Sequence, residues 1–458
     1  MKQQVPGGFT MSQQPMDRRR FLTNVAALGA VTIVPRHVLG GAGHTAPSAK
    51  LNIAGIGIGG MGKHNLRQLA TENIVALCDV DHQYAAEVFR EYPQAKTYFD
   101  YREMLETQPE IDAVMIATPD HTHAVIAMEA MRRGKHVYCQ KPLTHNVYES
   151  RMLARAAKQY GVTTQMGNQG HSAEGIRLIC EWIWDGAIGE VREVDAWCSL
   201  SYYPFGHAYW SSKWSRRPAD EPPLPQGHDW DIWLGPAPHR PYHPAYHPGV
   251  WRCWLDFGCG MMGDRGAHTL DSAAWALRLG HPDSIEATST GLNPDTHPLV
   301  SVVTYRFPAR GEMPPMKLTW YEGLRAPRPG ELEDGRQLGH PEGGILFKGS
   351  EGTIMAGVYG EGARLIPESK MKAYERPAQT LPRVEGSHEQ DWVRACKRGV
   401  PAGSHFGYSG PLTEICLLGN VAQRMDARIE WDGTAMKVTN LPEANECVRT
   451  PYRDGWSL

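Results

Sequence analysis

The chain has almost no net charge and only one short basic run. Its 458 residues carry a formal net charge of −3, and the only run of three consecutive basic residues is Arg18–Arg20. A protein that binds nucleic acid normally presents a basic patch or stripe, so we expect no nucleic-acid partner.

Paired cysteines are also missing. The nine cysteines are odd in number and scattered, and no two of them form a Cys-x-x-Cys pair. This pattern argues against a disulfide framework and against a zinc knuckle.

A long apolar run is absent as well. The longest, roughly Val25–Val34, is too short to span a bilayer comfortably. Arginines precede it and the small residues of "LGGAGHTA" follow it, which is the order of a signal peptide. Arg18 and Arg19, followed by Phe21-Leu22, fit the twin-arginine pattern. We therefore predict that residues 1–48 are a cleaved twin-arginine signal peptide with a linker. The protein is then exported to the periplasm by the twin-arginine machinery, without a stable membrane anchor.

From Leu51 onward, short apolar strands alternate with helical patterns up to about residue 170. Such alternation predicts βαβ units and a doubly wound parallel sheet, so residues 49–170 are expected to form a Rossmann domain. Residues 171–458 begin with a helix and an irregular stretch rich in Pro, Trp, His and Tyr, and continue with strand-like segments separated by turns. The predicted fold class is α/β, with a C-terminal α+β domain built on a large, mostly antiparallel open sheet.

A glycine-rich loop follows the first predicted strand. It reads Gly-x-Gly-x-x-Gly and opens a helix, the context in which backbone and helix N-terminus hold a dinucleotide pyrophosphate. The predicted cofactor-binding residues of the loop are Gly57, Gly59, Gly60, Met61 and Gly62. Asp79 ends the next strand, where a carboxylate binds ribose hydroxyls and repels a 2′-phosphate. The sequence therefore favours NAD over NADP.

Three further stretches carry a family resemblance. They are "ATPDHTHA" (117–124), "GKHVYCQKPLTHN" (134–146) and "GDRGAHTLD" (263–271). With the glycine loop and the closing "LTEICLLGNVAQR", they resemble the Gfo/Idh/MocA family of nicotinamide-dependent oxidoreductases. The resemblance implies a sugar or polyol dehydrogenase-type enzyme and a homodimer or homotetramer formed through the C-terminal sheet.

The same resemblance implies three catalytic residues, Lys141, Asp264 and His268. Lys141 matches a Glu-Lys-Pro motif beside the nicotinamide, although Gln140 replaces the Glu here. Lys141 would stabilise a developing alkoxide, and His268 is suited to remove the hydroxyl proton. Asp264 would orient the histidine, bind a neighbouring hydroxyl, or only cap a helix. If a helix begins near Asp264, the i, i+4 spacing places Asp264 and His268 on one face.

Other residues are expected near the ligands. The resemblance places the loop containing Thr118, Pro119, His121 and His123 over the cofactor, with Gln140 and Lys141 beside it. His121 would contact the cofactor directly or through another residue, and for His123 the alternative is packing at the start of a helix. Asn168 and His171 follow the last strand of the nucleotide domain and are predicted to bind substrate, together with Lys141, Asp264 and His268. For His171 the alternatives are a proton relay and a structural role.

Aromatic residues are concentrated in the middle of the chain, where ten of the fourteen tryptophans lie between Trp182 and Trp275. Aromatic faces with polar groups suit a sugar, and Tyr246 is the predicted substrate contact; the alternative is a packed core or a subunit interface. His243 and His247 have His-x₃-His spacing, which is a spacing found in metal sites, so a bound metal has to be considered. Prolines flank both histidines and no carboxylate motif accompanies them, so no metal is predicted.

The predicted function joins these signals. An exported enzyme meets no free NAD, but the twin-arginine route moves folded proteins, which can carry a bound cofactor with them. We therefore expect a tightly bound NAD. It would exchange hydride with a secondary alcohol of a sugar, glycoside or polyol. The alternative is an NAD-dependent glycosidase or lyase that acts through a transient 3-keto sugar, because oxidation at C3 acidifies the C2 proton.

Overall fold

The computed structural model describes residues 49–202 and 214–458, and the predicted signal peptide (1–48) lies outside them. Residues 51–458 form one compact unit. Among the described residues no helix is long and apolar enough to cross a membrane.

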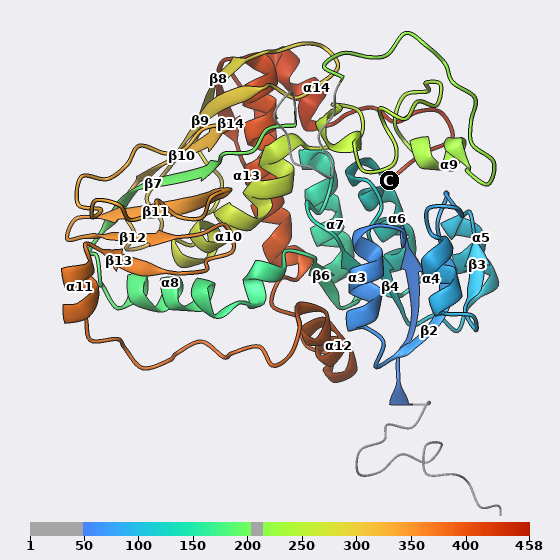
Figure 1. Cartoon of the computed structure of the whole chain (residues 1–458), viewed down its shortest axis with the longest axis horizontal. Helices are drawn as coiled ribbons and strands as arrows, with labels where there is room; N and C mark the ends of the chain where they lie inside the picture. Colours follow the sequence, from blue (N-terminus) through green and yellow to red (C-terminus); the bar gives the residue numbers. More distant parts are fainter. Residues whose placement is uncertain (1–48, 203–213) are drawn as a thin grey trace, which may run out of the picture. The chain divides into compact units, whose positions relative to one another are not determined.

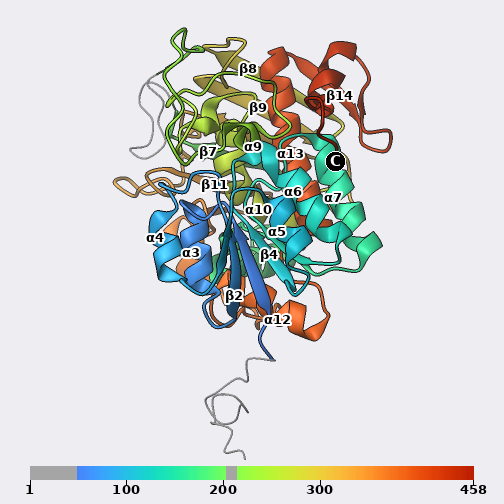
Figure 2. The same ribbon diagram turned by 90° about the vertical axis from the view of Figure 1, so that its right-hand side faces the viewer.

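The first half contains a six-stranded sheet in the order β3-β2-β1-β4-β5-β6, and all its neighbouring strands are parallel. Its strands are β1 (Asn52–Ile56), β2 (Asn73–Cys78), β3 (Lys96–Tyr98), β4 (Ala113–Ile116), β5 (His136–Cys139) and β6 (Thr164–Met166). Its helices are α3 (Met61–Gln68), α4 (Ala86–Glu91), α5 (Tyr101–Thr107), α6 (Asp120–Arg132) and α7 (Val147–Tyr160). Figure 2 shows α3 and α4 on one side of the sheet and α5, α6 and α7 on the other. This doubly wound arrangement confirms the predicted Rossmann fold.

Local signals explain where these helices begin and end. Asn146 and Glu149 form a reciprocal capping box at the start of α7, and Gly161 ends the helix in the left-handed conformation. Helix α6 starts directly after Pro119, earlier than its apolar pattern suggests. The extra turn brings Asp120 and His121 into the helix.

The second half is built on a nine-stranded sheet in the order β13-β12-β11-β7-β10-β9-β8-β14-β15. Its strands are β7 (Val191–Cys198), β8 (Ser284–Thr290), β9 (Val300–Phe307), β10 (Met316–Glu322), β11 (Gly343–Gly349), β12 (Thr353–Ala356), β13 (Arg364–Ile366), β14 (Arg428–Asp432) and β15 (Lys437–Val438). Only β7 and β10 pair in parallel, and the other neighbours are antiparallel. The mostly antiparallel sheet is as predicted.

The helices of this half are α8 (Glu174–Trp184), α9 (Trp230–Leu234), α10 (Ala267–Ala276), α11 (Glu368–Ala373), α12 (His388–Arg398), α13 (Phe406–Met425) and α14 (Asn445–Val448). Short helical turns are η2 (Gln169–Ser172), η3 (Trp251–Cys253), η4 (Met262–Gly266) and η5 (Pro442–Ala444). Helices α10 and α13 pack on the large sheet, and α13 also packs along α7. In Figure 1 they lie between the large sheet and the Rossmann half.

Helix α12 belongs to the part of the chain after the predicted domain boundary at residue 170, but it packs on the Rossmann half. It contacts α3 and β5, and Trp392, Val393 and Cys396 are buried with Leu66 in a core cluster of the Rossmann sheet. A late segment of the chain therefore completes the core of the first domain.

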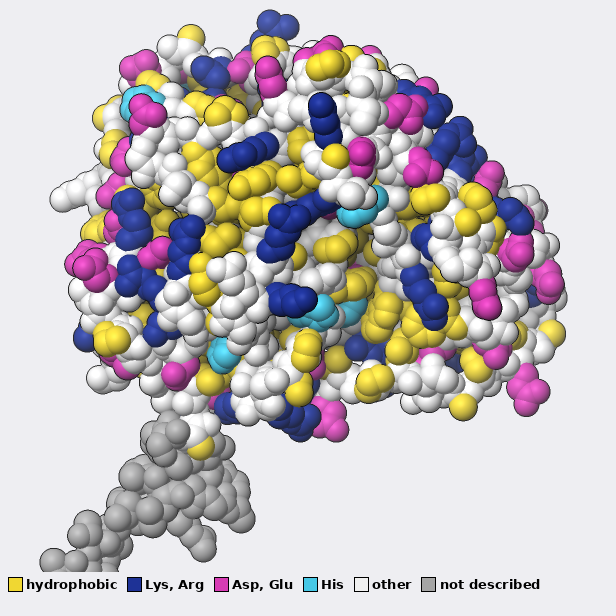
Figure 3. Space-filling view, turned by 180° about the vertical axis from the view of Figure 1, so that it is seen from behind, with side chains coloured by type: hydrophobic (Ala, Val, Ile, Leu, Met, Phe, Trp, Pro, Cys, Tyr) yellow, Lys and Arg dark blue, Asp and Glu magenta, His cyan; other side chains and the backbone are white. Residues whose placement is uncertain are grey.

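The surface carries both signs of charge. On the face in Figure 3, Lys and Arg side chains are interspersed with Asp, Glu and hydrophobic side chains.

Candidate active site

One cavity runs along the C-terminal edge of the parallel sheet. It begins at the glycine loop after β1 and reaches the residues that follow β4 and β5, with a wall from the second half of the chain. In an open parallel sheet, ligands bind where the strand order reverses, which here is the crevice between β1 and β4.

The glycine loop has the geometry that a dinucleotide requires. Gly57 has a φ of +75°, and a Cβ on Gly62 would lie 2.2 Å from the carbonyl oxygen of Gly57. The first glycine thus permits the turn and the third permits close packing of α3 on the loop. A Cβ on Gly59 would meet the ring of Tyr84 at 2.2 Å, so Tyr84 packs directly against the loop. The sequence analysis did not single out Tyr84.

The side chain of Asp79 hydrogen-bonds to the backbone of the glycine loop. Its Oδ2 accepts hydrogen bonds from the backbone N–H groups of Ile58 (2.8 Å) and Gly59 (3.1 Å), and its Oδ1 accepts from the N–H of Asp81 (3.0 Å). Burial raises the pKa of this carboxyl, and the three backbone N–H groups oppose that rise. Asp79 also lines the cavity, where a carboxylate oxygen can accept from ribose hydroxyls. It holds the loop in shape as well as facing the predicted ribose site.

The three predicted catalytic residues meet at the other end of the cavity. The Nζ of Lys141 forms an ion pair with Oδ1 of Asp264 and donates to the backbone carbonyl of Asp264 at 3.0 Å. His268 lines the same space. Asp264 lies in the π-helical turn η4, which continues without a break into α10, and His268 lies in the first turn of α10. Both residues line the cavity from this one helical stretch.

The electrostatics at this end keep Asp264 charged and His268 neutral. Lys141, Arg252 and Arg265 lower the pKa of the Asp264 carboxyl against the effect of burial. Burial lowers the pKa of His268 well below its ordinary value, and Lys141 adds to the decrease. Asp264 Oδ2 and His268 Nδ1 are buried and have no hydrogen-bond partner among the described residues. Such atoms fit a polar ligand that enters the cavity.

Asp120 is a further carboxyl in this cavity that the sequence analysis missed. It occupies the first turn of α6, and its Oδ2 accepts from the backbone N–H of Cys259 at 3.0 Å. Burial raises its pKa to about 7, with Arg252 and Lys141 opposing. The only available signal was its position directly after Pro119, at a strand-to-helix turn.

Of the loop after β4, Thr118, Pro119 and His123 line the cavity. The His123 ring contacts the carbonyl oxygens of Pro142 (2.8 Å) and Thr118 (2.9 Å), so it ties this loop to the Lys141-Pro142 segment. His121 lies outside the cavity lining. Its ring contacts the carbonyl oxygens of Trp233 (2.9 Å) and Phe257 (3.2 Å), so a cofactor contact for His121 is corrected to a structural one.

Gln140 also lines the cavity. Its Nε2 donates to Oδ1 of Asn65 at 3.0 Å, and the Nδ2 of Asn65 donates to Glu389 of α12 at 2.7 Å. Gln140 therefore links the Lys141 segment to α3, a contact that an amide can donate and a carboxylate cannot.

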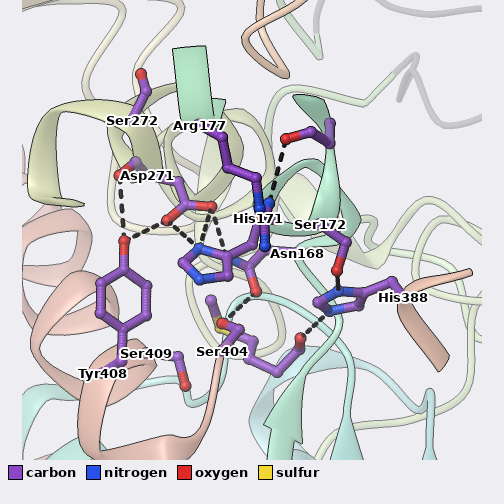
Figure 4. A network of polar contacts seen from close by, with 12 residues as sticks. Asn168, His171, Ser172, Arg177, Asp271, Ser272, His388, Ser404, Tyr408 and Ser409 are labelled. Atoms are coloured by element: carbon purple, nitrogen blue, oxygen red, sulfur yellow. Dashed lines mark hydrogen bonds and ion pairs between the residues drawn. The ribbon is translucent and has the colours of Figure 1, made fainter. Parts of the chain in front are cut away.

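Asn168 and His171 do not reach the cavity, which corrects their assignment to substrate binding. They lie at the end of β6 in a buried network around Asp271 of α10 (Figure 4). Asn168 Nδ2 donates to Asp271 Oδ2 at 2.9 Å, the His171 ring contacts Oδ1 at 3.0 Å, and Tyr408 donates to the same oxygen at 2.5 Å. The turn η2 that follows β6 packs on α10, and of its residues Gln169 lines the cavity.

Tyr246 is likewise outside the cavity lining. It is 2% exposed and packs edge-on against Trp254 and Phe257, so it belongs to the core alternative. Trp233, Trp251 and Arg252 of the same irregular region do line the cavity. The aromatic residues of this region thus contribute both to the hydrophobic core and to the lining of the cavity.

Three groups in this region, Asp81, His228 and His247, have ligand atoms within 4.8 Å of one another and could hold a metal. However, the indole N–H of Trp233 donates to His247 Nδ1 at 3.1 Å, and His247 Nε2 lies 3.0 Å from Asp81 Oδ2. A neutral ring that accepts at Nδ1 carries its proton on Nε2. This arrangement makes Asp81 and His247 a hydrogen-bonded pair.

Comparison with known proteins agrees with this architecture. Residues 51–168 match the family described as "Oxidoreductase family, NAD-binding Rossmann fold", and residues 203–309 match "Oxidoreductase family, C-terminal alpha/beta domain". The two matched stretches are therefore similar to the two domains of the Gfo/Idh/MocA oxidoreductases, and the first of them matches that family's NAD-binding Rossmann domain.

Among curated relatives, a levoglucosan dehydrogenase from Pseudarthrobacter phenanthrenivorans is 31% identical over 152 residues, which are 31% of this chain and 39% of that protein. A scyllo-inositol 2-dehydrogenase (NAD(+)) from Bacillus subtilis is 34% identical over 122 residues, 26% of this chain and 35% of that protein. The alignments thus span less than half of each relative.

Solved structures share the fold over most of the chain. The WlbA dehydrogenase from Bordetella pertussis, in complex with NADH and UDP-GlcNAcA, has a TM-score of 0.60 at 17% identity and covers 84% of this chain and 99% of its own. Levoglucosan dehydrogenase in complex with NADH has a TM-score of 0.54 at 19% identity and covers 83% of this chain and 98% of its own.

Proposed function

We propose that this protein transfers hydride between a secondary alcohol of a sugar, glycoside or polyol and a tightly bound NAD cofactor. The main support for this proposal is one cavity that is lined by the glycine loop, by Asp79 and by the predicted catalytic residues Lys141, Asp264 and His268. The named activities of the relatives, dehydrogenation of levoglucosan and of inositol, support this substrate class.

The residues fit NAD. The glycine loop would hold the pyrophosphate and Asp79 the adenosine ribose, while Gln140 and Lys141 would lie beside the nicotinamide. When bound, the nicotinamide supplies the hydride acceptor or donor.

Lys141 is held to stabilise a substrate oxygen. Its Nζ donates to Oδ1 and to the backbone carbonyl of Asp264, and an ammonium has three protons. One donor remains for the substrate hydroxyl, whose oxygen gains negative charge as its proton leaves. A fixed positive charge at that point is worth on the order of 10²–10³ in rate.

His268 would take that proton on its buried Nδ1, which has no hydrogen-bond partner among the described residues. Because burial and Lys141 lower its pKa, the ring is neutral and can accept. Asp264, ionised, holds Lys141 in position and balances its charge.

We also propose that the protein is exported through the twin-arginine pathway to the periplasm, and that it forms a homodimer or homotetramer. The arginine pair, the apolar run and the small residues of the N-terminal segment support export. A tightly bound cofactor is what an enzyme needs where free NAD is absent.

The first experiment measures the nucleotide and the turnover together. Purified, desalted protein is denatured and the released nucleotide identified by mass, and sugars and polyols are then screened for a change in bound NADH fluorescence. We expect about one NAD(H) per chain and a loss of hydride transfer of at least about 100-fold in Lys141→Ala. Lys135→Ala serves as the matched control, because the side chain of Lys135 donates only to the carbonyl of Pro109 among the described contacts. Wild-type turnover in Lys141→Ala would refute the assignment.

An aryl glycoside separates the two catalytic outcomes. Release of its phenol without net change in NADH identifies cleavage through a transient 3-keto sugar, and stoichiometric NADH formation identifies net oxidation.

A further inference from the structure

The adenosine end of the cavity is covered by parts of the chain far from the Rossmann domain in sequence. This end is identified by Asp79 after β2 and by Phe99 and Tyr101 around the end of β3, which all line the cavity. The strand order places β2 and β3 on the opposite side of β1 from Lys141. A dinucleotide that is held at the glycine loop must therefore extend its adenosine toward Phe99 and Tyr101.

The first covering part is the segment that leads into α9. The N–H of His82 donates to the carbonyl of Gly227 at 3.0 Å, and the N–H of Asp229 donates to the carbonyl of Val80 at 2.8 Å. This two-way pairing docks the segment on the loop after β2. It brings Ile232 and Trp233 of α9 into the cavity lining.

The second part is the C-terminal tail, residues 449–458. Arg453 fastens it to α9, because its backbone N–H donates to the carbonyl of Pro236 at 2.9 Å and its Nε donates to the carbonyl of Gly235 at 3.0 Å. At the far end, Arg132 of α6 donates to the carbonyl oxygen of Leu458 at 2.9 Å. The tail thus spans from α9 to α6, and Figure 1 shows the chain end beside these helices.

Between these two anchors, Trp456 enters the lining of the cavity together with Phe99 and Tyr101. The guanidinium of Arg102 lies over the Trp456 ring, 5.0 Å from its centre, and this cation–π contact holds the indole in place. An aromatic ring in this position has an adenine base as its natural partner, since bases stack on aromatic side chains without requiring a particular hydrogen-bond pattern.

We propose that Trp456 packs against the adenine of the cofactor and that the tail, fastened by Arg453 to α9, acts as a clasp that slows release of the dinucleotide. The inference rests on the proposed function in that the ligand is NAD. It assigns retention of the cofactor to residues that lie almost 400 positions after the glycine loop.

The test compares release of NADH from the full chain and from two variants, Trp456→Ala and Arg453→Ala. NADH fluorescence is followed after mixing with excess NAD, and affinities are measured for NADH and for reduced nicotinamide mononucleotide, which lacks the adenosine. Trp184→Ala is the matched control, because Trp184 is 37% exposed on α8 and does not line the cavity.

We expect Trp456→Ala to release NADH about tenfold faster or more, Arg453→Ala to do the same with Trp456 intact, and both variants to bind the mononucleotide as the wild type does. Equal losses for both ligands would overturn the clasp, since they would show a general disturbance of the fold. Wild-type release rates in both variants would also overturn it. If the wild-type protein binds neither ligand, the proposed function itself fails, which is a distinguishable outcome.

Discussion

Removing the carboxylate of Asp271 should reveal how strongly the buried network at the end of β6 holds the two halves together. Asp271 lies on α10, is 0% exposed and contacts Asn168, His171 and Tyr408. Two of these partners follow the last Rossmann strand and the third lies on α13. The substitution Asp271→Ala deletes the shared acceptor and leaves the partner groups buried.

The expected loss of folding stability is large for a single substitution. Each buried donor left without an acceptor costs about 1–3 kcal/mol, and a single substitution that costs more than about 4–5 kcal/mol is exceptional. We therefore expect Asp271→Ala to lower the free energy of unfolding by about 3–5 kcal/mol. Asp271→Asn should cost about 1–2 kcal/mol, because its carbonyl oxygen can still accept while its amide meets the donor of Asn168.

Urea unfolding followed by tryptophan fluorescence gives both values. Glu190→Ala is the control, since Glu190 and its partner Arg192 are 57% and 59% exposed, and such a pair contributes at most about 1 kcal/mol. A loss below about 1 kcal/mol for Asp271→Ala would refute the reasoning that this network is an important contact between the halves.

Two other substitutions test the loop and a buried acid. Gly62→Ala should weaken NADH binding at least tenfold and destabilise the fold by about 1–3 kcal/mol, because its Cβ would lie 2.2 Å from the Gly57 carbonyl oxygen. Gly280→Ala, with no atom within 4 Å of the new Cβ, should bind NADH normally, and equal affinities in both variants would contradict the close-packing argument. Burial raises the pKa of Glu322 to about 7, so the folded state binds its proton more tightly than the unfolded state and loses stability as pH rises from about 4.5 through 7. Glu322→Gln should therefore gain stability relative to wild type between pH 5 and pH 8 in thermal unfolding scans; a difference independent of pH would show that Glu322 is ionised in the fold.

The sequence was most informative where the signal is local. Apolar runs separated by helices predicted the parallel sheet, because such strands are buried on both faces. The turn chemistry of Gly57–Gly62 and the resemblance around Lys141, Asp264 and His268 indicated residues that the structure brings into one cavity.

Contacts between residues far apart in the sequence could not be predicted, and they determine the other site assignments. His171 and Asn168 have polar side chains after a strand, as active-site residues do, but their partner Asp271 is about 100 residues away and consumes their hydrogen bonds. The inward orientation of Tyr246 depends on Trp254 and Phe257. Nothing in the pattern around Trp456 shows which strand end it approaches, since that depends on how the whole second half folds back.

The return of α12 and of the tail onto the Rossmann half has a consequence for synthesis of the protein. The core around Leu66 is incomplete until Trp392 has left the ribosome, and the adenosine end of the cavity is incomplete until Trp456 has followed. At about 5–20 residues per second, the roughly 400 residues between Gly57 and Trp456 take on the order of 20–80 s to make. The nascent chain therefore exposes its nucleotide site unfinished for most of that time, and the proposed clasp can form only after the segment that contains Trp456 has been made.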